Sequence, residues 1–193
     1  MAENKIKYGI KNCYYAVATI ANDGTATYGT PVALPGAVSL SMDAQGERTP
    51  FYADNIEYWV SNWNNGYEGD LTLARVPDSF HTDILGDVVD GKNILVEKAN
   101  VTPIHFALLF QFEGDQQATK HVLYNCTASR PSIVGNTKEE QIAPETEAVT
   151  ITAKSIYVSA LSADVVKAKT TEDTDSTAYG AWFTTVQLPT APT

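Results

Sequence analysis

The strongest structural signal in the sequence is the alternation of side chains in the stretch 104-IHFALLFQF-112. All five even-numbered positions are apolar, whereas the odd-numbered positions include His105 and Gln111. Successive side chains of a strand point to opposite faces of a sheet. The pattern therefore predicts a β-strand that lays one face on a core.

Other segments of the same kind predict a mainly β fold. The run 119–126 is expected to pair with 104–112 as a hairpin across the polar turn 113–118. In the run 147–158 the apolar residues change parity, which predicts a β-bulge near Lys154 or Ser155. Further strands are predicted at 12–19, 37–42 and 180–186.

One segment, residues 77–86, has the features of a helix. Pro77 suits a first turn, Asp78 favours the positive N-terminus, and Gly86 suits a C-terminal cap. Phe80 and Ile84 lie four residues apart, so a short helix would cover one side of a sheet. The intervening segments are expected to be loops: 43–55, 86–93, 134–146 and 167–178.

The absence of heptads, repeats and composition changes favours a single domain over residues 1–193. Lys and Arg number 13 against 23 Asp and Glu, which gives a net charge of -10. That balance argues against binding to nucleic acid or to an anionic membrane. The longest apolar run is far shorter than the roughly 20 residues that a membrane helix needs. No secretory signal is visible, so Cys13 and Cys126 are expected to be reduced structural thiols.

Catalytic and metal-binding patterns are missing from the sequence. His105 and His121 fall in the predicted hairpin, and His105 could approach Cys126, but the further ligands of a zinc site are lacking. No nucleophile-elbow, phosphate-loop or zinc-protease motif occurs. Most carboxylates cluster in predicted loops, where solvated charge is the usual interpretation, although a glycosidase-like acid pair is not excluded by residue type. We expect no enzyme, no metal and no cofactor.

The segment 56-IEYWVSNWNNGYEGDLTLARV-76 combines aromatic, amide and acidic side chains. Asn65-Gly66 is typical of a two-residue hairpin turn. The resulting register would pair Val60 with Leu71 and Tyr58 with Leu73 on an apolar face. The opposite face would carry the polar and indole side chains, namely Glu57, Trp59, Ser61, Trp63, Glu68, Asp70 and Thr72.

Two tryptophans on a polar face need a partner, because exposed aromatic patches usually mark contact sites. Three interpretations remain open at this point. A loop or the helix of the same chain could cover Trp59 and Trp63. Another subunit could bury them, since Trp is favoured at interface centres. They could also form a platform that stacks on sugars.

Several segments in order along the chain resemble the major tail proteins, or tail tube proteins, of long-tailed non-contractile phages of Gram-positive bacteria. The segments that carry the resemblance are 9-GIKNCYYAV-17, 31-PVALPGAVSLSMDAQGE-47, 50-PFYADNIEY-58, 66-GYEGDLTLARVPDSFHTDILG-86, 106-FALLFQFEGD-115, 123-LYNCTASRPS-132 and 179-YGAWFTTVQLP-189. They span nearly the whole chain, and their sum rather than any single motif makes the likeness specific.

The resemblance implies a tail tube fold, in which two packed β-sheets are flanked by one short α-helix, with flexible N- and C-terminal arms. In that family a long loop between early strands reaches into the next ring, and residues 43–55 would be that loop. The implied subunit interface comprises Arg48, Phe51, Tyr52, Trp59 and Trp63. Glu57, Glu68 and Asp70 are the candidates for acids that line the lumen.

The function implied by the resemblance is structural. Hexameric rings would stack into a virion tail tube that conducts the genome into the host, and DNA would pass through without specific binding. Implied partners are copies of the same chain and other tail proteins such as the tape measure and the tail terminator, assembled in the host cytoplasm. The rival interpretations are a carbohydrate-binding β-sandwich and a hydrolase with a carboxylate pair.

Overall fold

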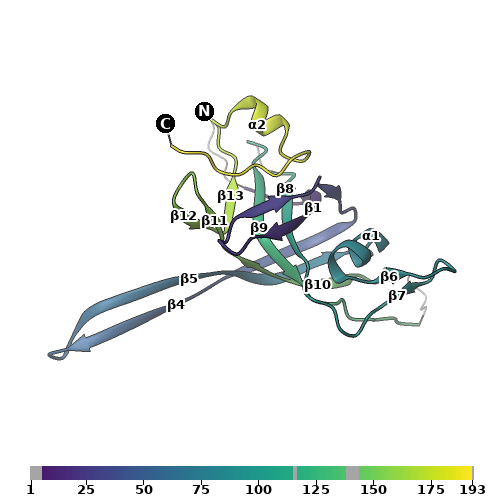
Figure 1. The fold of residues 1–193 in the computed structure, drawn as a ribbon, viewed down its shortest axis with the longest axis horizontal. Coiled ribbons are helices and arrows are strands. Elements are labelled where there is room, and N and C mark those ends of the chain that lie inside the picture. The colour runs from purple at the N-terminus through teal and green to yellow at the C-terminus, as the bar shows by residue number, and fades with distance from the viewer. Residues whose placement is uncertain (1–5, 115–116, 138–143, 193) are drawn as a thin grey trace.

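A computed structural model describes residues 6–114, 117–137 and 144–192. The predicted mainly β fold with a short helix is confirmed (Figure 1). The elements are β1 (Ile10–Ile20), β2 (Ala26–Tyr28), β3 (Val32–Ala33), β4 (Ala37–Ala53), β5 (Ile56–Leu73), α1 (Asp78–Phe80), a π-helical turn (His81–Leu85), β6 (Val88–Val89), β7 (Leu95–Val96), β8 (His105–Phe112), β9 (Lys120–Ala128), β10 (Glu147–Lys154), β11 (Ile156–Val158), β12 (Ala163–Val165), β13 (Lys167–Lys169) and α2 (Ser176–Gly180).

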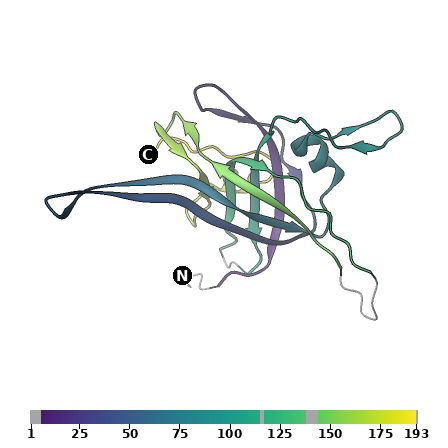
Figure 2. The same ribbon diagram turned by 90° about the horizontal axis from the view of Figure 1, so that it is seen from below.

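Nine strands form one antiparallel sheet in the order β2-β1-β8-β9-β10-β5-β4, with β3 on β1 and β13 on β9. The sheet curls, because β4 at one edge also contacts β1 near the other. Two small sheets, β11–β12 and β6–β7, lie outside it. The β4–β5 pair runs far beyond the body as a long ribbon (Figures 1 and 2).

Both faces of the central strands are buried. The concave face packs a first core from β1, β5, β8, β9 and β10, which includes Phe106 and Leu108. The other face of β8 and β9 packs a second core, in which Leu109 meets Trp182 and side chains of β11. The predicted hairpin of β8 and β9 is confirmed. The expectation of one core-facing side for 104–112 is wrong, because the C-terminal segment covers the second face.

The predicted helix is confirmed as one turn of α-helix followed by a π-helical turn. Phe80 is fully buried, and its ring meets those of Tyr15 and Phe106 edge to face at 5.3 and 5.7 Å. Gly86 ends the helix in the left-handed conformation, with φ 76°. The segment therefore seals one end of the first core.

Several segments differ from the sequence-based expectations. Residues 180–186 form the end of α2 and following turns instead of a strand, because Trp182 and Val186 insert into the second core. At Ser155 the chain leaves the large sheet for the β11–β12 sheet, so the predicted bulge is a strand break. The predicted loops 43–55, 86–93 and 167–178 contain parts of β4, β6, β13 and α2. Residues 138–143 of the fourth predicted loop lie outside the described residues.

Candidate assembly surface on the β4–β5 arm

The β4–β5 hairpin turns at Asp54 and Asn55, because Ala53 pairs directly with Ile56. Both turn residues have positive φ, at 52° and 65°, as a tight two-residue turn requires. Asp and Asn accept this conformation better than other residues with side chains. The predicted turn at residues 65–66 is wrong, since β5 runs through it without reversal.

Asn65 and Gly66 instead form a bulge at the base of the ribbon. The register shifts by one residue between Ala44 and Gly46, and Gly66 takes up the irregularity with φ 89°. Lys154, the last residue of β10, donates from Nζ to the backbone oxygen and Oδ1 of Asn65, at 3.2 and 3.0 Å. Because β10 ends here, no third strand from the described residues pairs with the ribbon beyond this point.

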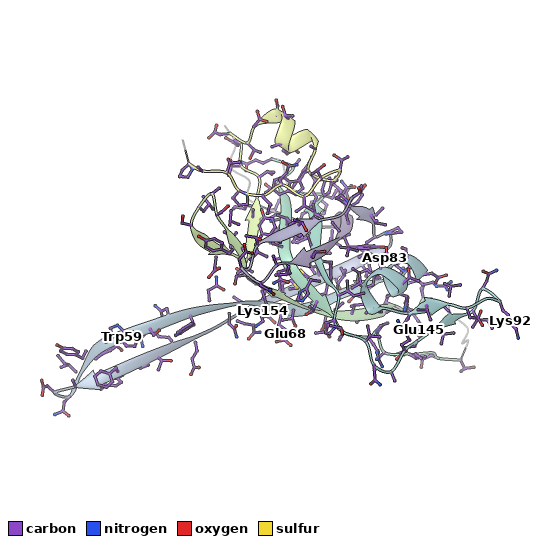
Figure 3. All side chains as sticks on the ribbon, in the orientation of Figure 1. Trp59, Glu68, Asp83, Lys92, Glu145 and Lys154 are labelled. Atoms are coloured by element: carbon purple, nitrogen blue, oxygen red, sulfur yellow. The ribbon has the colours of Figure 1, made fainter. Side chains whose placement is uncertain are left out.

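We call residues 46–64 of the unsupported ribbon the arm. Figure 3 shows Lys154 and Glu68 at its base and Trp59 far out from the body. Phe51 pairs with Trp59, and Glu47 pairs with Trp63. These two pairs are an even number of residues apart along each strand, so their side chains point to the same side of the ribbon. The three aromatic rings therefore share one face of the arm.

The two indoles are open to solvent, because Trp59 is 59% exposed and Trp63 is 71% exposed. The interpretation that the chain's own loop or helix covers them is therefore wrong. Both lie away from the core, as predicted, but on an arm and not across a 65–66 hairpin. Burial by another protein and stacking on a sugar remain as interpretations.

The other face of the arm carries Tyr52 and an ion pair. Tyr52 lies opposite Glu57, and the carboxylate of Glu57 accepts from Nη2 of Arg48 at 2.6 Å. Tyr58 lies at a second register shift and is 71% exposed. Ile56 pairs with Ala53, which shares the face of Phe51, and is 61% exposed.

The five predicted interface residues, Arg48, Phe51, Tyr52, Trp59 and Trp63, thus all lie on this arm. Sequence reasoning did not include Tyr58 and Ile56. The density of apolar and aromatic residues between positions 50 and 63 is the signal that could have added them.

Glu68 and Asp70 lie on a polar face of the body, where β4, β5 and β10 run side by side. Glu68 sits between Asp43 and Thr152, and Oγ1 of Thr150 donates to Asp70 at 2.7 Å. The neighbouring Leu71 and Leu73 are buried on the opposite side of the sheet. The same face also carries Ser39, Ser41, Thr72 and Lys154.

Glu57 does not share the polar face with Glu68 and Asp70. It lies near the end of the arm in its ion pair with Arg48. Its predicted place beside the other two acids is wrong, because the register was built on the wrong turn.

The histidines are engaged in local contacts. Nδ1 of His105 lies 2.7 Å from Oδ1 of Asn125, and the His121 ring stacks on Phe110 at 5.1 Å. In the described part of the chain no group of three His, Cys, Asp or Glu side chains could hold a metal ion. The same residues include no helix long and apolar enough to cross a membrane.

Cys13 and Cys126 are free and buried in the first core, so the expectation of unpaired structural thiols is confirmed. Burial raises the pKa of each thiol to about 12. A protonated thiol reacts poorly as a nucleophile, so both side chains serve the core as small apolar groups.

A family model described as phage tail tube protein matches residues 2–107. No curated protein sequence matches the chain. Among solved structures, a chain of the "Cryo-EM structure of the anti-feeding prophage (AFP) baseplate, 6-fold symmetrised" aligns with a TM-score of 0.48 at 8% identity. The alignment covers 90% of this chain and 99% of that one.

Proposed function

Because the chain belongs to the phage tail tube protein family and is a structural component of the virion tail, we propose that it polymerises as stacked hexameric rings into the tail tube. The genome leaves the virion through this tube. The observation that carries the proposal is the arm, which exposes large aromatic side chains away from the folded body.

An isolated two-stranded ribbon is at best marginally stable in water, and exposed apolar patches mark interaction sites. The arm combines both properties, with Phe51, Tyr58 and Trp63 all more than half exposed. Contact with another copy would bury these rings and order the ribbon. Such a contact joins two different surfaces, so it is heterologous and can continue into rings or filaments.

The sheet edges support ring formation. Within the described residues the large sheet ends at β4 on one side and at β2 and β3 on the other. Unpaired strand edges template further pairing, and closure into a barrel removes them. We propose that edges of neighbouring copies join into a continuous inner barrel.

The polar face that carries Glu68 and Asp70 is proposed to line the lumen. It is rich in hydroxyl and carboxylate groups, and it lies on the side of the sheet opposite the first core. Six copies of a chain with a net charge of -10 carry a charge of -60. An acidic lumen repels phosphates and lets DNA slide, in contrast to the basic surface of a DNA-binding protein.

The remaining partners follow from the same function. A tube of defined length needs proteins that set and close its ends, so a tape measure and a tail terminator are proposed to contact the ring faces. Synthesis and assembly are proposed to take place in the cytoplasm of the host. A structural role of this kind requires no catalytic residue and no cofactor.

A carbohydrate-binding module is the alternative function. A hollow of about 520 Å³ beside Trp63 is lined by Gln45, Glu47 and Asn64, which are groups that bind sugars. The hollow lies on a projecting ribbon and not in a rigid cleft, which favours assembly. The alternative predicts a single copy that binds glycans and loses binding with Trp63→Ala.

Light scattering of the purified protein across a wide concentration range separates the two functions. The proposed function predicts a mass that rises with concentration to that of rings and tubes. A particle of one chain at all practical concentrations would overturn it.

A further inference from the structure

A second exposed apolar hairpin lies at the pole of the molecule opposite the arm. β6 and β7 form a separate two-stranded sheet in which Val88 pairs with Val96. These two side chains, and those of Val89 and Ile94, are between 41% and 54% exposed. We call residues 88–96 the aliphatic hairpin. Exposed apolar patches mark interaction sites, so the aliphatic hairpin, like the arm, is a candidate contact surface.

The two surfaces point away from each other. Lys92, at the tip of the aliphatic hairpin, and Trp59, on the arm, lie at opposite ends of the longest axis of the molecule (Figure 3). Figure 2 shows the same separation from a perpendicular direction. One molecule therefore cannot bring its arm onto its own aliphatic hairpin, whereas a second copy placed head to tail can.

The aliphatic hairpin is held in shape before any partner arrives. Oδ1 of Asp90 accepts from the backbone nitrogens of Lys92 and Ile94, both at 2.8 Å, which fixes the turn. Arg130 ties the following segment to the body, through Glu97 at 2.6 Å and the backbone oxygen of Lys98 at 3.1 Å. A preformed surface loses little entropy on binding.

The charges of the two surfaces are complementary. The arm holds the acids Glu47, Asp54 and Glu57 against the cation Arg48, which gives a net charge of -2 (three acids and one cation). Residues 88–98 carry the cations Lys92 and Lys98 and the acids Asp90 and Glu97. Because Glu97 is paired with Arg130, this region taken with Arg130 has a net charge of +1, from three cations and two acids. Neither lysine forms an ion pair within the described residues. Opposite potentials favour correct pairing of two surfaces.

Building on the proposed function, we infer that the aliphatic hairpin is the surface on which the aromatic arm of another copy docks. The arm supplies flat rings and acids, and the aliphatic hairpin supplies branched side chains and lysines. The two surfaces differ and lie at opposite poles. A docked pair of copies therefore still has one free arm at one end and one free aliphatic hairpin at the other. The resulting polymer has a direction.

Disulfide trapping tests this contact. Thr49 lies on the arm face of Trp59 and Trp63, between their pairs, and Gly91 lies beside Lys92 with open space around it. The variant Thr49→Cys/Gly91→Cys is expected to form a ladder of disulfide-linked chains under mild oxidation. The matched control is Thr49→Cys/Gly180→Cys, because Gly180 is equally unobstructed but lies at the end of α2.

The docking inference predicts at least a tenfold stronger ladder for the Gly91 variant than for the Gly180 variant. The buried thiols Cys13 and Cys126 are common to both. Tubes that form normally while the two ladders are equal, or while the Gly91 ladder is absent, would overturn the docking surface and leave the proposed function intact. A wild-type protein that does not assemble would overturn both.

Charge reversal provides a second variant that needs no cysteine. Lys92→Glu places an acid against the acidic arm, so the protein concentration needed for assembly is expected to rise several-fold. The control Lys169→Glu makes the same change on β13, on the body, and is expected to leave that concentration unchanged. Equal behaviour of the two variants would contradict docking at the aliphatic hairpin.

Discussion

Phe51 of β4 lies directly opposite Trp59 of β5 near the end of the arm, and both rings are more than half exposed, at 58% and 59%. Cross-strand aromatic pairs stabilise a sheet. Here no layer of the described chain lies behind the sheet to bury them. The pair therefore holds the ribbon together and also offers a surface to another molecule.

Trp59→Ala and Trp63→Ala are expected to weaken assembly more than folding. Neither indole belongs to the cores, so the free energy of unfolding should change by no more than about 0.5 kcal/mol. A buried interface Trp is worth about 2 kcal/mol or more, which is roughly a thirtyfold rise in the concentration needed for assembly. Thermal melting and light scattering measure the two effects.

Leu161→Ala is the matched control for the indole variants, because it removes an exposed apolar side chain away from the arm. It should assemble as the wild type does. Indole variants that form normal tubes but melt early would show that the rings belong to the packing of the domain.

Gly66→Ala is expected to destabilise the base of the arm. The residue has φ 89°, and an added Cβ would collide with the backbone oxygen of Ala153. The left-handed conformation alone costs about 1–2 kcal/mol for a residue with a side chain. A lower melting temperature is expected, whereas Gly91→Ala, in open space, should melt near the wild type. Equal melting temperatures for the two variants would contradict the positive-φ bulge at Gly66.

Glu68→Lys combined with Asp70→Lys is expected to leave tubes intact but to slow genome ejection. The substitution places positive charge on the proposed lumen face, where it would bind phosphates. Genome ejection is measured on phage that carry the variant, as the rate at which DNA is released after the receptor is added. The control changes the exposed acids Asp164 and Asp173 to lysine. An unchanged rate of ejection would contradict the proposal that an acidic lumen lets DNA slide, or the assignment of Glu68 and Asp70 to the lumen.

Stability is expected to fall at alkaline pH. Burial raises the pKa of the thiols of Cys13 and Cys126 from 9.0 to about 12, and that of the Tyr15 hydroxyl from 10.0 to about 12. The unfolded chain loses these protons first, so the free energy of unfolding is retained below pH 9 and decreases from there toward pH 12. Urea unfolding at pH 8 and pH 10.5 measures the difference.

The two cysteines give an independent readout of the same burial. They should resist a maleimide in the folded protein at pH 8 and react once urea unfolds it. Fast labelling of the folded protein, or equal stability at pH 8 and pH 10.5, would contradict this account of the first core.

Local sequence signals predicted the parts of the fold that local chemistry decides. The alternation in β8 and the polar turn after it were sufficient for the β8–β9 hairpin. Pro77, Phe80 and Gly86 were sufficient for the short helix, because a start signal, an apolar face and a positive-φ stop coincide there.

The arm could not be predicted from local signals because two sites compete for the turn. Asn65-Gly66 has the stronger turn propensity, and Gly66 does adopt positive φ, but as a bulge. Pairing of Tyr67 to Leu73 with β10 keeps β5 extended through that point. The turn at Asp54-Asn55 lies in a segment that packs on neither core. Its sequence therefore lacks the alternation of apolar and polar residues that would indicate a strand.

The second core was missed for a related reason. Ala107 and Leu109 are apolar odd-numbered positions between His105 and Gln111, and their burial depends on a distant C-terminal segment. Trp182 joins that core, and its Nε1 donates to the backbone oxygen of His121 at 3.3 Å. A short aromatic run such as 180–186 has the same composition in a strand and in a packed turn.

Copies of this chain are proposed to assemble through the arm into a hollow tube. Negative-stain electron microscopy of the purified wild-type protein beside Trp59→Ala tests it most directly. Hollow tubes or rings with six-fold end views are expected for the wild type, and mostly unassembled particles for the variant. Single compact particles in both samples would contradict the claim.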